Sequence, residues 1–493
     1  MISRSDKAAF LIVANAFKYA VGFLMPVALV RLLSQSDYGT YQQLILVGNT
    51  ALSLMVIGLP VSIYYFYHQD SPERIPSLLG QTSVMLALVG MLAVGIIYVG
   101  ARPLAVLLNN PSMAGLLSVY AVSVGFMIAC EHVGPLIIAQ NRYKLAVGLE
   151  ISETCVRVLV LLAPLAYGLG LSGVVAGLVA FGIMRFAGRS LYLYWGSGMQ
   201  FNKWQKTAFP REQLAYCLPL ALMSLTGLIA GTINKGIVAA SFSPAEFAIY
   251  SVGILEIPLD VIFQASVADV LRSTLPALVR DGNYREIARV IREATRKLAI
   301  IVLPSFVFLF GYADEFVTSV FTPRYRESVQ VFQIYVWLMP LHMFVLSFVP
   351  QIFGKPKINL YIAFLMSIIT ILLSFMLLKL MGLYGPALAM VIATYLTVFI
   401  YVIVVIKLTK TSITLLFPVF AIFRIIVAAL VGLVVARLLQ AFGIPGALGF
   451  LLSALVFSIT FLVGALLLRV FTARDISLIR RWLGKVVPRF GRK

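Results

Sequence analysis

The sequence predicts an all-α polytopic membrane protein with about fourteen transmembrane helices, arranged as two parallel six-helix lobes and a C-terminal helix pair. Three observations lead to this prediction: the composition, the spacing of apolar segments and an internal repeat. Hydrophobic residues make up 61% of the 493 residues and charged residues only 12%, whereas soluble domains have about 45–50% and about 25%. So little charge cannot cover a water-exposed surface, so most of the surface must face lipid.

The chain is strongly basic, with 39 Lys and Arg residues against 19 Asp and Glu residues and a net charge of +20. In a soluble protein this excess would indicate nucleic-acid binding. Here the loops between apolar segments are short, so we assign the excess to orientation in the membrane and to attraction by anionic headgroups. We therefore expect membrane lipids, and no nucleic acid, among the partners.

Segments long enough to cross a bilayer follow one another along the whole chain, since a crossing takes about 20 mostly apolar residues. The first segment contains Lys18, is too long for a secretory signal and lacks a small-residue cleavage site, so we expect it to be retained. The predicted segments are 8–33, 40–67, 77–99, 114–140, 143–168, 171–195, 214–241, 246–278, 297–321, 327–354, 357–380, 384–407, 415–436 and 447–470.

The distribution of Lys and Arg predicts the orientation of these segments. With the N-terminus inside and the segments alternating, 26 basic residues fall at inside ends and six at outside ends. Basic residues concentrate on the cytoplasmic side of membrane proteins, so both termini are predicted to be cytoplasmic. The loop 281–297 and the tail 476–488 carry apolar residues at helical spacing among basic ones. We expect both to form amphipathic helices on the cytoplasmic surface.

An octet near the start of the chain recurs in its second half. Ser34–Tyr41 and Ser243–Tyr250 share the pattern Ser-x-x-acid-aromatic-small-x-Tyr, and Ser followed by an acid three residues later is typical of a helix start. Two weaker matches at nearly the same offset indicate a duplicated unit. Because an even number of segments separates the octets, the two copies are parallel. The predicted divisions are an N-terminal lobe 1–205, a C-terminal lobe 206–412, a helix pair 413–471 and a basic cytoplasmic tail 472–493.

Several motifs, in order over residues 1–410, give the chain a resemblance to a known family. They are Arg31–Tyr41, Gly58–Pro60, Tyr216–Pro219, Ala245–Tyr250 and Leu275–Pro276. With these motifs the chain resembles the polysaccharide flippases of the multidrug/oligosaccharidyl-lipid/polysaccharide exporter superfamily. The resemblance implies two lobes around a central cavity, alternating access and a polyprenyl-pyrophosphate-linked oligosaccharide as substrate. It also implies a bacterial inner membrane, with a polysaccharide polymerase and assembly proteins as candidate partners.

Basic residues inside the predicted helices are the candidate substrate-binding groups. A charge near the bilayer centre costs about 2.5–3.5 kcal/mol, so it normally faces protein or a water-filled cavity. Fixed cations in a wet cavity would lower the barrier to a pyrophosphate. The candidates are Lys18, Lys235, Arg157 and Arg424, with Asn15 and Asn234 as cavity-lining polar residues. Three other arginines lie toward cytoplasmic helix ends and are expected to reach the headgroups: Arg185, Arg189 and Arg272.

Each candidate cation also has a structural interpretation. Arg157 follows Glu153 by four residues, which is favourable for an ion pair on a helix, and Arg424 lies in the extra helix pair, outside the two lobes. Lys18 and Lys235 could be partnered structural charges.

Acids and histidines within the helices are the candidate coupling groups. Glu256 and Asp260 share one face of the segment 246–278, where they could bind a proton or Na⁺, or neutralise the cations. Glu131-His132 and His342 could carry protons, although single histidines in a bundle are more often only hydrogen-bonded.

Two further functions stay open beside a flippase. One is a cation-coupled exporter of drugs or small solutes from the same superfamily, although the net basic charge inside the helices suits an anionic ligand better. The other is an enzyme, a membrane polysaccharide polymerase or ligase, but the outer loops are short and no catalytic set stands out. The three cysteines lie in apolar segments without metal-ligand or disulfide spacing. We therefore expect no enzyme activity, no metal and no cofactor.

Overall fold

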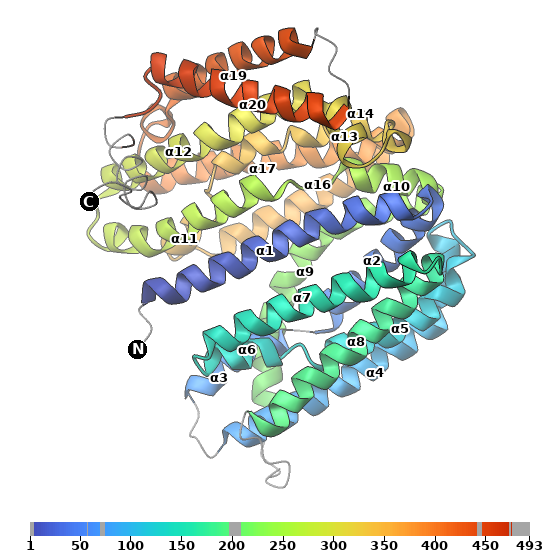
Figure 1. Ribbon diagram of the computed structural model, residues 1–493. Helices are drawn as coiled ribbons and strands as arrows, with labels where there is room; N and C mark the ends of the chain where they lie inside the picture. Colours follow the sequence, from blue (N-terminus) through green and yellow to red (C-terminus); the bar gives the residue numbers. More distant parts are fainter. Residues whose placement is uncertain are drawn as a thin grey trace, which may run out of the picture. The chain divides into compact units, whose positions relative to one another are not determined.

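The computed structural model describes residues 4–56, 58–69, 74–196, 209–440, 446–472 and 475 (Figure 1). Side chains are described throughout these ranges except in the helical residues 4–16, 209, 210, 219, 220, 222–230 and 259. All regular structure in the described part is helical, as predicted. The predicted amphipathic tail 476–488 lies outside the described residues.

The chain divides into two compact units. Unit 1 comprises Met1–Pro258 and Leu360–Ala393, and unit 2 comprises Leu259–Asn359 and Thr394–Lys493. One boundary follows the first residue of α11 (Pro258–Arg280), and the other two pass through α16 (Lys357–Met381) and α17 (Gly385–Thr409). Unit 1 therefore takes helices from both halves of the sequence, and the predicted divisions 1–205, 206–412, 413–471 and 472–493 stay a prediction.

Unit 1 is a bundle in which α4 packs on α5, α5 on α8, α8 on α7 and α7 on α1. Two predicted segments are each broken into two helices: 40–67 gives α2 and α3 around Gly58 (φ 71°), and 114–140 gives α5 and α6. The helices are α1 (Arg4–Leu32), α2 (Gln35–Met55), α3 (Leu59–Gln69), α4 (Ile75–Leu107), α5 (Met113–Ala129), α6 (Val133–Ala139), α7 (Tyr143–Ala166), α8 (Gly170–Trp195), α9 (Phe209–Ser241) and α10 (Pro244–Gly253).

Unit 2 packs α12 against α19, and α19 against α20. The expected surface helix 281–297 is not separate, because it continues into the membrane segment as the first turns of α12. The segment 327–354 breaks into three short pieces. The helices are α11 (Pro258–Arg280), α12 (Tyr284–Gly311), α13 (Ala313–Val320), η2 (Pro323–Tyr325), α14 (Ser328–Val336), η3 (Met339–Met343), α15 (Val349–Ile352), α18 (Ile413–Leu416), α19 (Val419–Gln440) and α20 (Gly446–Leu467), with η4 (Gly382–Tyr384) between α16 and α17.

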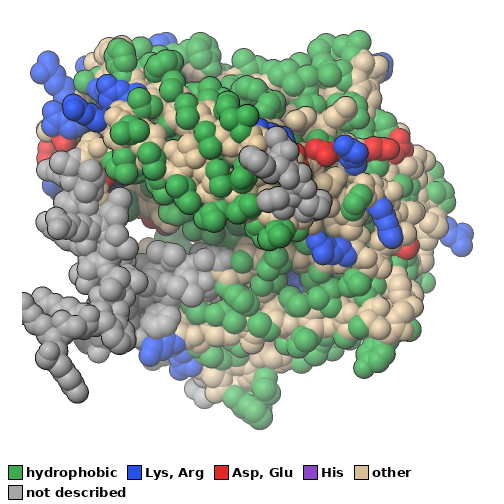
Figure 2. Space-filling view, turned by 45° about the horizontal axis from the view of Figure 1, so that its top comes forward, with side chains coloured by type: hydrophobic (Ala, Val, Ile, Leu, Met, Phe, Trp, Pro, Cys, Tyr) green, Lys and Arg blue, Asp and Glu red, His purple; other side chains and the backbone are tan. Residues whose placement is uncertain are grey.

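The helices are long and apolar enough to cross a membrane repeatedly. Eight helical stretches within the described ranges meet this condition by length and composition, among them 357–409, which contains both α16 and α17. Hydrophobic side chains cover much of the surface seen in Figure 2. The protein is thus an all-helical, multi-pass membrane protein, as the composition predicted.

The two repeated octets begin helices that touch each other inside unit 1. The Ser34 hydroxyl accepts a hydrogen bond from the Asp37 amide at the start of α2. Ser243 and Glu246 form a complete capping box at the start of α10, so both predicted helix starts are confirmed. α2 and α10 pack so closely that a Cβ on Gly39 would lie 1.7 Å from the Pro244 carbonyl oxygen.

We expect Gly39→Ala to destabilise the protein strongly, because the new methyl group would overlap a backbone atom that cannot rotate away. Gly22→Ala is the matched control, since nothing lies within 4 Å of a Cβ at that helical position. Replacing a helical glycine there should stabilise by about 0.5–1 kcal/mol or change nothing. Melting temperatures of both detergent-purified variants test this. Equal melting temperatures would contradict the close approach.

A buried arginine joins the end of α20 to α12. Arg296 donates to Glu293 Oε1 and to Asp475 Oδ2, both at 2.7 Å, and to the Val470 carbonyl oxygen at 3.0 Å. Asp475 also accepts from the Thr472 amide and hydroxyl. Burial acts to raise the pKa of Asp475, but these hydrogen bonds outweigh it, and the pKa lies below its ordinary value. The carboxylate form therefore favours the folded state.

The stability that Asp475 contributes should depend on pH. A lowered pKa means that the contribution is complete above the ordinary aspartate pKa of about 3.9 and is lost as the pH falls through the folded-state value. The melting temperature of Asp475→Asn should therefore lie below that of the wild type by a constant amount near neutrality, and the gap should close below about pH 4. Asp269→Asn, at an exposed pair with Arg272, is the control. A gap that widened on acidification would refute the assignment.

Candidate functional site

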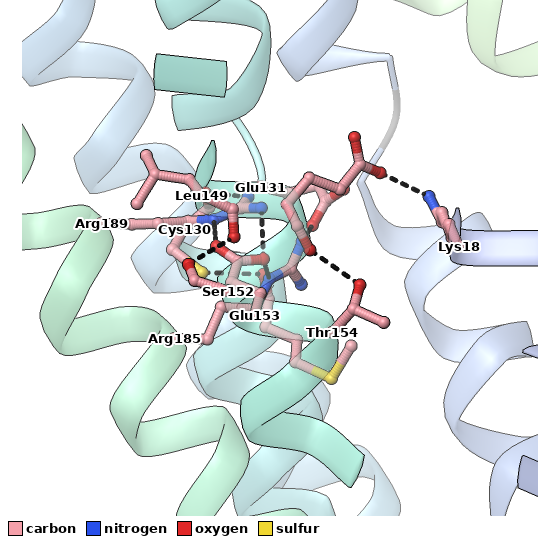
Figure 3. A network of polar contacts seen from close by, with 11 residues as sticks. Lys18, Cys130, Glu131, Leu149, Ser152, Glu153, Thr154, Arg185 and Arg189 are labelled. Carbon is pink, nitrogen blue, oxygen red and sulfur yellow. Dashed lines mark hydrogen bonds and ion pairs between the residues drawn. The ribbon is translucent and has the colours of Figure 1, made fainter. Parts of the chain in front are cut away.

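Six charged side chains from four parts of unit 1 form a cluster, a connected network of ion pairs (Figure 3). At its edge, Lys18 of α1 binds Glu150 of α7, with 2.8 Å between Nζ and Oε1. Both side chains are partly exposed, the lysine to 61% and the glutamate to 38%. Lys18 therefore has a partner within unit 1, and its ammonium still reaches the surface.

The interior of the cluster holds two arginines of α8 against two glutamates. Arg185 Nε lies 3.0 Å from Glu153 Oε2, and Arg189 Nε lies 2.7 Å from Glu153 Oε1. Arg185 also pairs with Glu131 at 3.1 Å. The two arginine side chains are only 12% and 13% exposed. The prediction that these arginines extend to the headgroups is therefore wrong, because a carboxylate inside the bundle holds them.

Helix periodicity brings these groups together. Arg185 and Arg189 are four residues apart, so they lie on one face of α8. Glu150 and Glu153 are three residues apart on α7, which packs on α8. At the break between α5 and α6 the Cys130 carbonyl oxygen accepts from the Val133 amide at 3.3 Å and from Arg189 at 3.2 Å. The cluster thus fixes the positions of α5, α7 and α8.

The cluster as a whole is electrically balanced. Three cations, Lys18, Arg185 and Arg189, face three acids, Glu131, Glu150 and Glu153. Within it the pairs differ in strength, because exposed ion pairs contribute about 0–1 kcal/mol, whereas removing one partner of a buried pair costs about 3–5 kcal/mol. The Lys18–Glu150 pair is the exposed one. It is therefore the pair that another anion could most easily replace.

The other predicted cations lie apart from this cluster. Arg157 is exposed on α7, and Arg424 is exposed on α19 in unit 2. The alternative pairing of Arg157 with Glu153 is wrong, since Glu153 binds the two α8 arginines instead. Lys235 is exposed near the end of α9, in the same unit as Lys18, and it interacts electrostatically with Glu256.

The predicted polar and acidic residues have mixed outcomes. The side chain of Asn15 lies outside the described residues. Asn234 is buried and does not line a cavity: it donates to the Pro386 carbonyl oxygen at 2.7 Å and accepts from Ser374 at 2.5 Å. Asn234 thus joins α9 to α16 and to the start of α17.

Glu256 and Asp260 do not share one helical face, because the chain is non-helical over 255–257. Glu256 is exposed in this segment and Asp260 is buried in the first turn of α11. Asp260 lies 2.5 Å from His342. His132 is hydrogen-bonded to Ser83 at 2.8 Å. Neither histidine is therefore isolated.

Sequence reasoning missed the roles of Glu131, Glu150, Arg185 and Arg189 in the cluster. The sequence did contain a pattern that indicates ion pairs between neighbouring helices. Two acids lie three residues apart in the segment 143–168, and two arginines lie four residues apart in the next segment, 171–195. Because both arginines were expected to reach the headgroups, they were not considered as partners of the acids on the neighbouring helix.

Comparison with known proteins identifies both a family and a fold. The sequence profile of the family described as "Polysaccharide biosynthesis protein" matches residues 28–330, more than half of the 493 residues. No curated protein matches the chain.

Several solved structures of membrane transporters have the same fold. The lipid II flippase MurJ in an inward closed conformation matches with a TM-score of 0.69 at 17% identity, over 94% of this chain and 98% of that one. An inward-facing multidrug-resistance MATE family transporter of the MOP superfamily matches with a TM-score of 0.62 at 13% identity, over 82% and 96%. A MOP superfamily transporter from Pyrococcus furiosus matches with a TM-score of 0.54 at 12% identity, over 82% and 96%.

The buried and exposed pairs should respond differently to loss of charge. We expect Glu153→Gln to destabilise the protein by about 3–5 kcal/mol, because two buried arginines lose their carboxylate. Glu150→Gln should change stability by less than about 1 kcal/mol, because its pair is exposed. Chemical or thermal unfolding of both variants in the same detergent tests this. If Glu150→Gln were the more destabilising, the assignment of the buried pairs as the structural ones would fail.

Proposed function

The chain belongs to the polysaccharide biosynthesis protein family, and on this premise we propose that it is a flippase for a polyprenyl-pyrophosphate-linked oligosaccharide. The substrate would be a precursor of a cell-surface polysaccharide, moved from the inner to the outer leaflet of a bacterial inner membrane. The observation that carries the proposal is the Lys18 ammonium, which is exposed near the middle of α1, within the otherwise uncharged stretch between Lys7 and Arg31, and is held by one partly exposed carboxylate. No covalent bond changes in such a reaction, so the protein would not act as an enzyme.

The proposed arrangement has fourteen crossings, two six-helix lobes around a central cavity, an additional helix pair and cytoplasmic termini. The fold similarity to MurJ over 94% of the chain supports it. The excess of basic residues at predicted inside ends supports the orientation. Transport would proceed by alternating access, in which one half moves relative to the other around a fixed site.

Lys18 would act by exchanging one anion for another. Its pair with Glu150 is exposed and therefore weak, whereas a pyrophosphate oxygen forms charge-assisted hydrogen bonds of greater strength. The substrate could thus displace Glu150 from the ammonium. The buried pairs of Arg185 and Arg189 would remain, so α7 and α8 keep their positions during the exchange. The isoprenoid chain would stay in lipid while the ammonium offsets the phosphate charge.

The other exposed cations extend the proposal. Lys235, Arg157 and Arg424 would meet the anionic substrate at other points of its path or bind anionic lipid. A polysaccharide polymerase and assembly proteins would receive the product. The gradient that drives transport, whether of H⁺ or Na⁺, is not part of this proposal.

Export of cationic drugs is the alternative that the fold allows, since MATE transporters share it. Binding of a labelled polyprenyl pyrophosphate and of a labelled organic cation to the purified protein separates the two functions. An exposed ammonium whose carboxylate partner can be exchanged binds anions and not organic cations, which favours the flippase. A polymerase or ligase is less favoured, because the fold is shared with transporters.

We expect Lys18→Ala to reduce binding of a polyprenyl-pyrophosphate oligosaccharide by about 10–100-fold, the equivalent of one hydrogen bond to a charged group. Lys18→Arg should retain most binding. Glu150→Gln should bind more tightly than the wild type, because it removes the competing carboxylate. Binding is measured with purified protein in nanodiscs. Unchanged binding by Lys18→Ala would exclude the ammonium as a substrate contact.

The function itself is tested in the native host. Deletion of the gene should cause a lipid-linked oligosaccharide to accumulate in the cytoplasmic leaflet, and mass analysis of extracted lipids would identify it. Expression of the wild-type chain should reverse the accumulation. Absence of any accumulated lipid-linked sugar would reject the flippase proposal.

A further inference from the structure

Unit 2 contains a titratable pair that is separate from the Lys18 cluster. Asp260 lies in the first turn of α11 with only 3% of its side chain exposed, and its Oδ2 lies 2.5 Å from His342 Nδ1. Its Oδ1 accepts from the Val261 amide at 3.0 Å. No Lys or Arg in the described ranges forms an ion pair with Asp260. A buried carboxylate whose ionic partner is a histidine depends on the proton that the histidine holds.

The pair lies where two membrane segments lose helical structure. α11 begins at Pro258, directly after the non-helical residues 255–257, and η3 ends at Met343, directly before the non-helical residues 344–346. Asp260 and His342 therefore connect the first turn of one helix to a short 3₁₀ helix. Such breaks are the places where membrane helices change direction most easily.

Other charges around the pair are few. α12 packs against η3, and it carries no titratable side chain between Lys297 and Tyr312. The next charged residues on α11, Asp269 and Arg272, are exposed and bind each other. On α17, the Tyr395 hydroxyl donates to the Trp337 carbonyl oxygen near η3. The charge state of the site is thus set by Asp260 and His342 themselves.

We infer that Asp260 and His342 form a proton-binding site that holds α11 to η3 when protonated and releases it when the proton leaves. When the imidazole is neutral and the carboxylate is ionised, the buried pair has a net charge of −1. Uptake of one proton by the imidazole gives imidazolium and carboxylate, with a net charge of zero, which a low-dielectric interior favours. His342 is 29% exposed, so the proton can enter through the imidazole.

This site would give the proposed flippase its coupling ion, and in that sense the inference rests on the proposed function. The proton-dependent contact itself does not require transport. It follows from the burial of Asp260 and from the identity of its partner, so it can be tested on the full chain without substrate.

Hydrogen–deuterium exchange of the full chain in nanodiscs, between pH 6 and pH 8, tests the contact. The protection factors of amides in 344–348 should fall with rising pH by up to about tenfold per pH unit, the limit for release of one proton. Asp260→Asn and His342→Gln should remove this dependence. His68→Gln, at an exposed histidine of α3, and Asp269→Asn should keep it. A pH-independent wild type, or an unaltered dependence in both site variants, would overturn the inference.

A second measurement separates this inference from the proposed function. Proteoliposomes are loaded with a fluorescent polyprenyl-pyrophosphate oligosaccharide, and its movement is followed with and without an imposed gradient of one pH unit. The wild type should respond to the gradient by several-fold, and His342→Gln should not. Proton-dependent protection without any movement of the lipid would reject the flippase and retain the proton site. Movement that ignores the gradient in the wild type would reject the coupling.

Discussion

Neutralisation of charge in an apolar surrounding is the constraint on which this structure depends. Each charge that enters a membrane helix costs free energy unless another group balances it. Unit 1 meets this requirement with three basic and three acidic side chains drawn from α1, α7, α8 and the break after α5. The same ion pairs fix the packing of those helices. The ion pairs of the cluster thus differ in burial: those of Arg185 and Arg189 with Glu153 are buried, whereas the Lys18–Glu150 pair is partly exposed.

Much of the fold could be predicted from the sequence because apolar length and helix caps are local properties. All fourteen predicted segments coincide with helices or with helices broken in the middle, and Ser34 and Ser243 begin helices as their patterns indicated. The breaks at 130–132 and 255–257 were not predicted. Glu131 and His132 lie in the first break and Glu256 in the second. Polar residues also lie within continuous helices, as Glu150 and Glu153 do in α7, so composition alone cannot locate a place where the backbone leaves the helix.

The candidate site was harder to predict because its contacts are between helices. Glu153 lies at ideal spacing for Arg157 on its own helix, yet it binds two arginines from α8. Spacing along one helix indicates a possible partner on that helix. Which partner a side chain binds depends also on the charged residues of the helices packed against it. Asn234 illustrates the same point, since a polar residue in a small-residue stripe turned out to join three helices. The sequence singled out Lys18 as a charge within a membrane-length segment, but its partner Glu150 is 132 residues away and could not be recognised from local spacing.

The continuity of α12 has a mechanical consequence. Its 28 residues give a rod of about 42 Å at about 1.5 Å per residue, longer than the roughly 30 Å hydrocarbon layer. Arg296, near the middle of the helix, binds Asp475, and Phe308, near its C-terminal end, packs beside Phe457 of α20. Because the helix is continuous between these two contacts, a displacement at Arg296 would be carried along it toward the contact with α20. Pro304 lies between Arg296 and Phe308 and cannot donate a backbone hydrogen bond, so a bend in α12 would form most easily at this residue.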